Sequence, residues 1–152
     1  MLPFRKIVAP TDFSDPSYQA LQRAGELAER FSAELLLVHV VAPMPAMAPV
    51  AIPTAFDLPM YQKGLRESAE KSLQEIINQR LPGELTVRPE VLMGQAADEI
   101  VRFAGEEDAD LIVIATHGAT GLEHILFGSV AEKVVRTAGC PVLTVPAEEE
   151  NK

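Results

Sequence analysis

The stretch that decides the fold is DLIVIATHGATGLEHILFGSVAEKVVRTAGCPVLTV, residues 110–145. It opens on an apolar run of strand length, Asp110 to Ala115, and closes on another, Pro141 to Val145. Between them, apolar residues recur at helical spacing from Val130 to Ala138. A strand, a helix and a strand in this order predict a crossover unit with two parallel strands.

The same alternation continues toward the N-terminus. Further apolar runs predict strands at Lys6 to Pro10, Glu34 to Val41 and Leu85 to Met93, the last at a sheet edge because it alternates. A first helix is expected to begin at Pro16, with Asp15 as its N-cap. A second is expected from about Met60 to Arg80, and a third is indicated by apolar residues at helical spacing, Ala97, Ile100, Val101 and Ala104. Five strands alternating with four helices predict an α/β fold with helices on both faces of a parallel sheet.

Length, composition and charge restrict the class of protein. The 152 residues, 47% of them hydrophobic, indicate one compact domain, residues 1–147, followed by a solvated acidic tail, residues 148–152. A net charge of −9 disfavours nucleic acid and anionic membranes as partners. Because the sequence has neither a signal-peptide core nor a membrane-spanning run, we expect a cytoplasmic protein. The single cysteine, Cys140, is interpreted as a half-buried small hydrophobe.

One connection is unusually long. Ala42 to Met60 holds five prolines and three methionines, and its only charge is Asp57. Prolines at this density exclude a regular helix, and connections of this length are usually functional or disordered. The segment is interpreted either as a lid or partner-docking segment, or as an apolar flap with no specific role.

Ligands of such sheets bind at the carboxyl ends of the strands, where the strand order reverses. Asp12 follows the first strand, and its carboxylate could accept hydrogen bonds from ribose or cap the first helix. Glycines in the loop after the fourth strand, Gly118 and Gly121, are expected to allow a positive φ and close approach to a ligand. A structural turn that happens to contain glycine is the alternative.

Residues 114–129 contain no lysine or arginine, so a phosphate there needs other partners. Gly128 and Ser129 lie where the fourth helix begins, which brings free main-chain N–H groups and the helix dipole. Hydroxyls of Thr116, Thr120 and Ser129 could add hydrogen bonds, with a divalent metal screening the remaining charge. Neither a Walker A sequence nor G-x-G-x-x-G occurs.

Four segments together resemble the universal stress protein family over nearly the whole chain. They are KIVAPTDFS, LLLVHVV, VLMGQAADEIV and the stretch quoted first, which is the most specific of the four. The resemblance implies a Rossmann-like fold of the adenine nucleotide alpha hydrolase type, with five parallel strands in the order 3-2-1-4-5. It also implies a homodimer formed through the last strand, Pro141 to Val145. If the chain is a nucleotide-dependent switch, the proline-rich connection or the dimer surface is expected to report occupancy to an unidentified protein partner.

The ATP-binding branch of that family carries the motif G-x2-G-x9-G-[S/T]. Gly118, Gly128 and Ser129 match it, whereas Ala115 replaces the first glycine; we expect this methyl to be harmless if Ala115 still belongs to a strand. The resemblance implies that the chain binds ATP together with Mg²⁺. It also implies that the Asp12 carboxylate contacts the ribose and that the Val40 backbone contacts the adenine. The implied nucleotide-binding residues are Pro10, Thr11, Asp12, Val40, Met93, Gly94, Ile114, Ala115, Thr116, His117, Gly118, Gly121, Gly128, Ser129 and Val130.

The sequence gives no indication of a catalytic centre. His117 and His124 flank the glycine loop without a group spaced to orient them, and His39 is interpreted as a hydrogen-bonded core residue. Hydrolysis of ATP would therefore be slow. Two functions fit: a nucleotide-dependent switch in a stress response, and a nucleotide-free dimeric interaction protein. A flavodoxin-like redox carrier is disfavoured, because the chain has no tryptophan and only two tyrosines to stack on a flavin.

Overall fold

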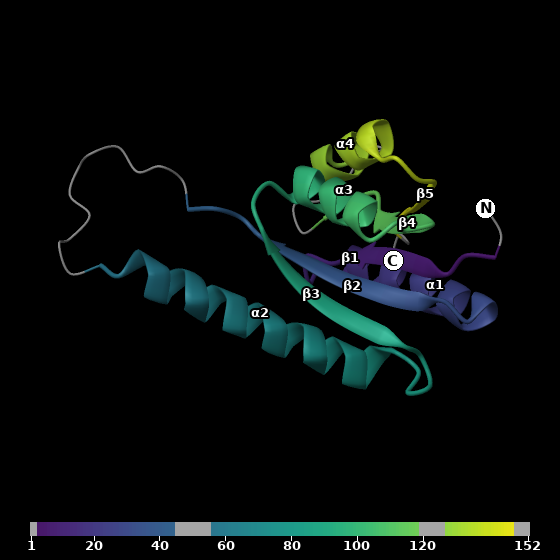
Figure 1. The fold of residues 1–152 in the computed structure, drawn as a ribbon, viewed down its shortest axis with the longest axis horizontal. Helices are drawn as coiled ribbons and strands as arrows, with labels where there is room; N and C mark the ends of the chain where they lie inside the picture. The colour runs from purple at the N-terminus through teal and green to yellow at the C-terminus, as the bar shows by residue number, and fades with distance from the viewer. Residues whose placement is uncertain (1–2, 45–55, 119–126, 148–152) are drawn as a thin grey trace, which may run out of the picture.

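A computed structural model describes residues 3–44, 56–118 and 127–147. Within these ranges five strands alternate with four helices, as predicted (Figure 1). In chain order the elements are β1 (Lys6–Pro10), α1 (Asp15–Phe31), β2 (Glu34–Val41), α2 (Leu58–Arg80), β3 (Val87–Met93), α3 (Ala96–Glu106), β4 (Leu111–Ala115), α4 (Ser129–Thr137) and β5 (Val142–Val145).

The strands form one parallel sheet in the order β3-β2-β1-β4-β5, which confirms the expected topology. Helices α1 and α2 cover one face, where Leu21 and Leu73 are fully buried, and α3 and α4 cover the other, where Ile100 and Val134 are buried (Figure 1). The interior strands β1, β2 and β4 are almost wholly buried, because both faces of the sheet are covered. Strand β3 lies at an edge, as its alternating pattern predicted.

Two helix starts differ from the sequence-based expectation. The N-cap of α1 is Ser14, whose hydroxyl accepts from the Ser17 N–H, so Asp15 is the first helical residue and not the cap. Helix α2 begins at Leu58, two residues before the expected Met60, because Asp57 caps it by accepting from the Met60 N–H at 3.0 Å. A proline is tolerated in this first turn, where no intrahelical acceptor exists for its missing N–H.

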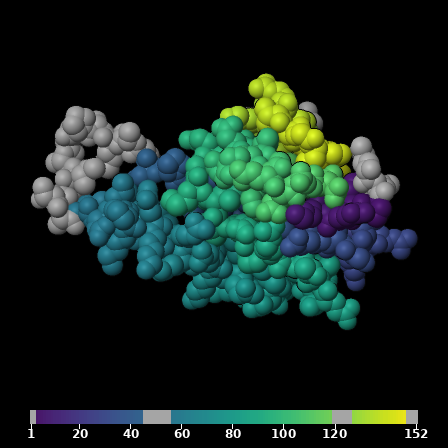
Figure 2. All heavy atoms as spheres, in the orientation of Figure 1, coloured from purple at the N-terminus to yellow at the C-terminus, as the bar shows by residue number. Residues whose placement is uncertain are grey.

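The rest of the proline-rich connection, residues 45–55, lies outside the described residues, so neither interpretation of it is tested. The amino-terminal half of α2 has no buried side chain, since the buried residues of this helix are Ala69, Leu73 and Ile76. That half extends past the end of the sheet (Figure 1), and its atoms lie toward the left of the space-filling view in the same orientation (Figure 2). In the described part of the chain no helix is long and apolar enough to cross a bilayer. Cys140 is half-buried, and burial raises the pKa of its thiol.

The strand order reverses between β1 and β4. From β1 the chain continues outward to β2 and β3, and then returns to the other side of β1 for β4 and β5. The carboxyl ends of β1 and β4 therefore diverge into connections on opposite faces, which leaves a crevice between them. This crevice is where a ligand site is expected.

Candidate functional site

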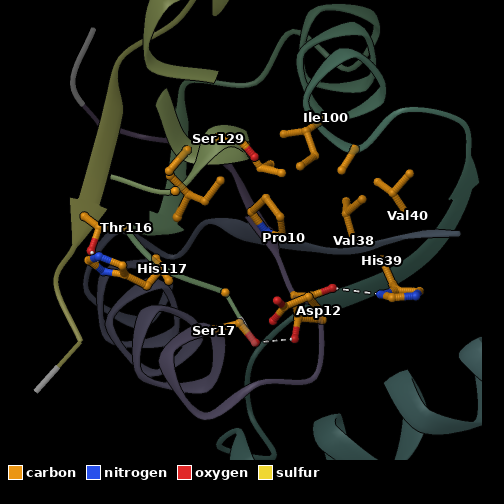
Figure 3. A pocket seen from close by; sticks show the side chains of 18 residues that line it. Pro10, Asp12, Ser17, Val38, His39, Val40, Ile100, Thr116, His117 and Ser129 are labelled. Atoms are coloured by element: carbon orange, nitrogen blue, oxygen red, sulfur yellow. Dashed lines mark hydrogen bonds between the residues drawn. The ribbon is translucent and has the colours of Figure 1, made fainter. Parts of the chain in front are cut away.

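A cavity of about 270 Å³ lies at this reversal point (Figure 3). Its volume is close to the lower end of the roughly 300–1,000 Å³ typical of ligand pockets. The walls come from the ends of β1, β2 and β4 and from the first turns of α1, α3 and α4. Its lining residues are Pro10, Thr11, Asp12, Ser17, Val38, His39, Val40, Ala96, Ile100, Ile114, Ala115, Thr116, His117, Gly118, Gly128, Ser129, Val130 and Ala131.

The turn from β1 into α1 is held by the Thr11 side chain. Thr11 is buried, its hydroxyl is 2.8 Å from the Ser17 hydroxyl, and it accepts from the Phe13 N–H at 3.1 Å. Its main-chain N–H donates to the Val38 carbonyl at 2.8 Å. The Thr11 hydroxyl is thus used within the turn and fixes the path of the residues that follow.

Asp12 is exposed, and its two carboxylate oxygens lie in different surroundings. Oδ1 accepts from the Ser14 N–H at 3.0 Å and also from the Ser14 hydroxyl. Asp12 therefore supports the capping turn of α1 but does not itself cap the helix, because Ser14 occupies that position. Oδ2 faces Gly118, where a Cβ added to the glycine would lie 2.6 Å from it.

Gly118 is a glycine because of this close approach, and not because of its backbone angle. The expectation of a positive φ at Gly118 is wrong: among the described glycines only Gly94 has one, at 145°. Any side chain at position 118 would push the Asp12 carboxylate out of place. Gly121, the other glycine expected to turn, lies outside the described residues.

The start of α4 presents main-chain donors to the cavity. Gly128 is the N-cap, no side chain caps the helix, and its own N–H donates to the Thr116 carbonyl at 2.6 Å. The next three residues, Ser129, Val130 and Ala131, line the cavity. Their N–H groups have no acceptor within the helix, since the first turn never provides one. A helix start of this kind favours an anionic ligand.

The opposite end of the cavity is apolar. Val38, Val40 and Ile100 project from β2 and α3 on the same face of the sheet (Figure 3). Along β2 the main-chain groups of Glu34 and Val38 bond toward β1, so alternation directs those of Val40 toward β1 as well. The last paired residue of β1 is Pro10, opposite Val38, so Val40 lies beyond the ladder and its main chain borders the cavity.

Ala115, which replaces the first glycine of the motif, is the last residue of β4 and is paired with Val145. It is buried, and its φ is not positive. The expectation that it still belongs to a strand is confirmed. Its methyl group therefore causes no backbone strain, and Ile114 beside it is also buried in the strand.

The histidines near the site are already engaged by neighbouring groups. His117 Nδ1 is 2.9 Å from the Thr116 hydroxyl, so this buried hydroxyl is occupied within the protein. His39 is hydrogen-bonded, as predicted, with Nδ1 2.8 Å from the Thr11 carbonyl oxygen. It is half-buried at the edge of the cavity, however, and not in the core. His124 lies outside the described residues.

Two of the expected site residues do not line this cavity. Met93 borders a separate apolar hollow beside α2, and the Gly94 N–H donates to the Val41 carbonyl at 3.0 Å. Conversely, the sequence-based list omits Ser17, Val38, His39, Ala96, Ile100 and Ala131. The sequence does hold a signal that could have predicted four of these residues, because parallel α/β sheets direct the start of each helix that follows a strand at the same crevice. These residues are Ser17, Ala96, Ile100 and Ala131, which lie at or near the starts of such helices.

Asp12 is the only Asp, Glu, Lys or Arg among the described lining residues. Within the described chain, moreover, no three His, Cys, Asp or Glu side chains gather in a way that could hold a metal ion.

Fold and site together define a Rossmann-like α/β protein with a cavity at its topological switch point. The family model of the universal stress protein family matches residues 3–146, and the chain belongs to this family.

Three relatives illustrate the match. Universal stress protein MJ0531 of Methanocaldococcus jannaschii is 40% identical over 142 residues, covering 93% of this chain and 82% of the relative. The solved structure of protein MJ0577 from the same organism has a TM-score of 0.79 at 26% identity, covering 97% and 99% of the two chains. A solved universal stress protein in complex with cAMP has a TM-score of 0.63 at 26% identity, covering 95% and 98%.

Proposed function

We propose that the cavity binds an adenine nucleotide, ATP together with Mg²⁺, and that the protein acts as a nucleotide-dependent switch or binding protein in a cytoplasmic stress response. The observation that carries this proposal is the juxtaposition of an anion-favouring helix start, at Gly128 and Ser129, with an apolar wall at Val38, Val40 and Ile100. A nucleotide has the same division into a charged end and a flat apolar end.

The phosphate end of this site consists of main-chain donors. The N–H groups of Ser129 and Val130 and the Ser129 hydroxyl would bind phosphate oxygens, and Gly118 lines the same cavity. The absence of a side chain at Gly118 supports this assignment, because it leaves room for the Asp12 carboxylate beside the loop that borders the phosphate end. Mg²⁺, where bound, would neutralise part of the phosphate charge.

The adenosine end lies toward β1 and β2. Asp12 would accept hydrogen bonds from ribose hydroxyls, and the adenine ring would lie against the apolar wall with its edge on the Val40 main chain. The family member solved with cAMP supports an adenine nucleotide as the ligand class. The strand geometry of Ala115 is compatible with the same site.

Hydrolysis is expected to be slow. The described walls contain no arginine or lysine to stabilise charge in a transition state, and no side chain there is arranged as a base for water. The site suits switchable binding better than turnover.

We also propose a homodimer through β5, since this strand is the outer edge of the sheet and Leu143 is 41% exposed on it. The same apolar edge favours the second candidate function, a dimeric interaction protein whose glycine loop is purely structural. The two candidates differ in one measurable respect, which is whether ATP binds.

Thermal shift with Mg-ATP, joined with native mass spectrometry of protein never exposed to added nucleotide, tests the proposal. We expect Mg-ATP to raise the Tm of the wild type and Gly118→Val to abolish the effect, because the valine would displace Asp12. Gly64→Val is the matched control, since a Cβ at Gly64 meets open space. An unchanged Tm at millimolar Mg-ATP in a dimeric wild type would leave the interaction protein as the function.

A further inference from the structure

The hydrogen-bond ladder between β1 and β2 ends abruptly at Thr11. In a parallel pair, a residue typically bonds its neighbour strand through both its N–H and its C=O. The Thr11 N–H donates to the Val38 carbonyl at 2.8 Å, so a continued ladder would have the Val40 N–H donate to the Thr11 carbonyl. That second hydrogen bond is not formed between these two residues.

The His39 side chain takes the place of the hydrogen bond that Val40 would form with Thr11. Nδ1 lies 2.8 Å from the Thr11 carbonyl oxygen, and because a carbonyl only accepts, Nδ1 carries the hydrogen (Figure 3). The His39 ring also packs on the Phe13 ring, with centroids 4.3 Å apart and an interplanar angle of 35°. The His39 side chain thus occupies the Thr11 carbonyl oxygen, which would accept the next hydrogen bond of the ladder.

The backbone at Phe13 explains why the turn after β1 needs the contacts that His39 makes. Phe13 has φ 65°, which is rare and costly for a bulky residue. This left-handed residue turns the chain out of the strand directly after Asp12. The Thr11 hydroxyl, which accepts from the Phe13 N–H, and the packing of the Phe13 and His39 rings both hold this turn.

We propose that His39 is a positioning residue for the nucleotide site. By holding the Thr11 carbonyl it ends the ladder, keeps the Val40 N–H available to the base of the ligand, and fixes the turn that carries Asp12. The His39 ring lies on the opposite side of β2 from Val38 and Val40, so it acts through Thr11 and not through contact with adenine (Figure 3). The identity of the ligand in this inference rests on the proposed function.

Two substitutions at His39 separate its hydrogen bond to Thr11 from the packing of its ring on Phe13. His39→Asn keeps an N–H near the position of Nδ1 and removes the ring, whereas His39→Phe keeps a ring against Phe13 and removes the donor. Phe4→Leu is the control for a general loss of stability, because it weakens the Phe4–Phe31 edge contact at 5.0 Å, far from the cavity.

Calorimetry with Mg-ATP gives the first measurement. We expect His39→Phe to weaken binding about fivefold to tenfold, the range that corresponds to one lost hydrogen bond. His39→Asn should remain within about twofold of the wild type, and Phe4→Leu should lower the Tm without changing Kd. Wild-type affinity in His39→Phe, or equal loss in both His39 variants, would overturn the inference.

Amide hydrogen exchange followed by NMR tests the same inference without any ligand. In the wild type the Val40 amide should exchange faster than the paired amides of β2, such as that of Leu36. In His39→Phe it should become protected, because the freed Thr11 carbonyl can accept it, and His39→Asn should restore fast exchange.

The two measurements keep the two proposals distinguishable. Failure of the wild type to bind Mg-ATP, with fast Val40 exchange that slows in His39→Phe, would refute the nucleotide proposal and leave the role of His39 intact. A Val40 amide as protected as Leu36 in the wild type, or unchanged by His39→Phe, would refute the role of His39.

Discussion

Ala115 shows how a departure from a motif is judged by backbone geometry. A glycine is required where φ is positive or where a Cβ would clash, and Ala115 meets neither condition, since it ends a regular strand. Gly118 is the opposite case, because its missing side chain makes room for Asp12. Two adjacent motif positions thus have different physical requirements.

This contrast gives a prediction for Ala115→Gly, which restores the family motif. We expect it to change the Kd for Mg-ATP by less than about twofold and to lower stability by roughly 0.5–1 kcal/mol, because glycine loses more chain entropy in a strand than alanine does. Urea denaturation and calorimetry measure the two effects. A gain in affinity of tenfold or more would mean that the methyl group obstructs the ligand after all.

Among the elements, α4 is the one whose geometry bears most directly on phosphate binding. Gly128 has φ −69° and ψ 158°, an extended conformation that a following proline favours. Proline also fits the first position of a helix, where the N–H has no intrahelical acceptor. The Ser129 amide can therefore be removed with little disturbance of the helix.

For Ser129→Pro we expect a Tm close to that of the wild type and an affinity for Mg-ATP reduced about tenfold, because a main-chain donor and the hydroxyl are both lost. Ser129→Ala removes only the hydroxyl and should have a smaller effect. Isothermal calorimetry on the three proteins provides the comparison. Equal affinities in all three would show that α4 does not bind the phosphates.

The start of β1 is joined to the start of β4 by one carboxylate. Asp110 Oδ2 accepts the N–H groups of Arg5 at 2.7 Å and Lys6 at 3.0 Å. These two main-chain donors lower the pKa of Asp110 below its usual value, that of Arg5 having the larger effect. The charged form is therefore favoured in the folded state.

Because the folded-state pKa is lowered, the contribution of Asp110 to stability is present above the unfolded pKa of about 3.9 and is lost as the pH falls through the folded value. Asp110→Asn should cost about 1–2 kcal/mol at pH 7, and the difference from the wild type should shrink below about pH 4. Urea denaturation at several pH values measures this difference. The exposed variant Glu67→Gln should stay within about 0.5 kcal/mol of the wild type throughout; a pH-independent cost for Asp110→Asn would contradict the assignment.

For the whole molecule, two edges of the sheet remain after the helices have covered its faces. At one edge β3 contains Pro89 and the charged residues Arg88 and Glu90, which discourage pairing with another chain. At the other edge β5 is short and apolar, VLTV, with Leu143 exposed. The molecule is therefore asymmetric in the edges that it offers to a second copy.

We expect Leu143→Asp to convert the proposed dimer to a monomer, since two like charges would face each other across the edge. Because Leu143 is not among the residues that line the cavity, Mg-ATP should still bind. Analytical ultracentrifugation and calorimetry on the same sample measure both properties. A variant that stays dimeric would indicate a different interface or none through β5.

The sequence by itself determined the class of fold, the order of its elements and the edge of the sheet where a ligand would bind. Hydrophobic periodicity and capping residues act over a few neighbouring positions, so Glu34–Val41 and Lys6–Pro10 are recognisable without any long-range information. Even the conformation of Ala115 followed from the strand pattern around it.

Only the tertiary structure decided how the site is built. Gly118 meets Asp12, and His39 bonds the Thr11 carbonyl, because strands distant in the chain are adjacent in the sheet. These contacts depend on the register and separation of β1, β2 and β4, which no local pattern encodes. For the same reason Met93 and Gly94, at the end of β3, lie outside the cavity, whereas Ile100 of α3 lines it.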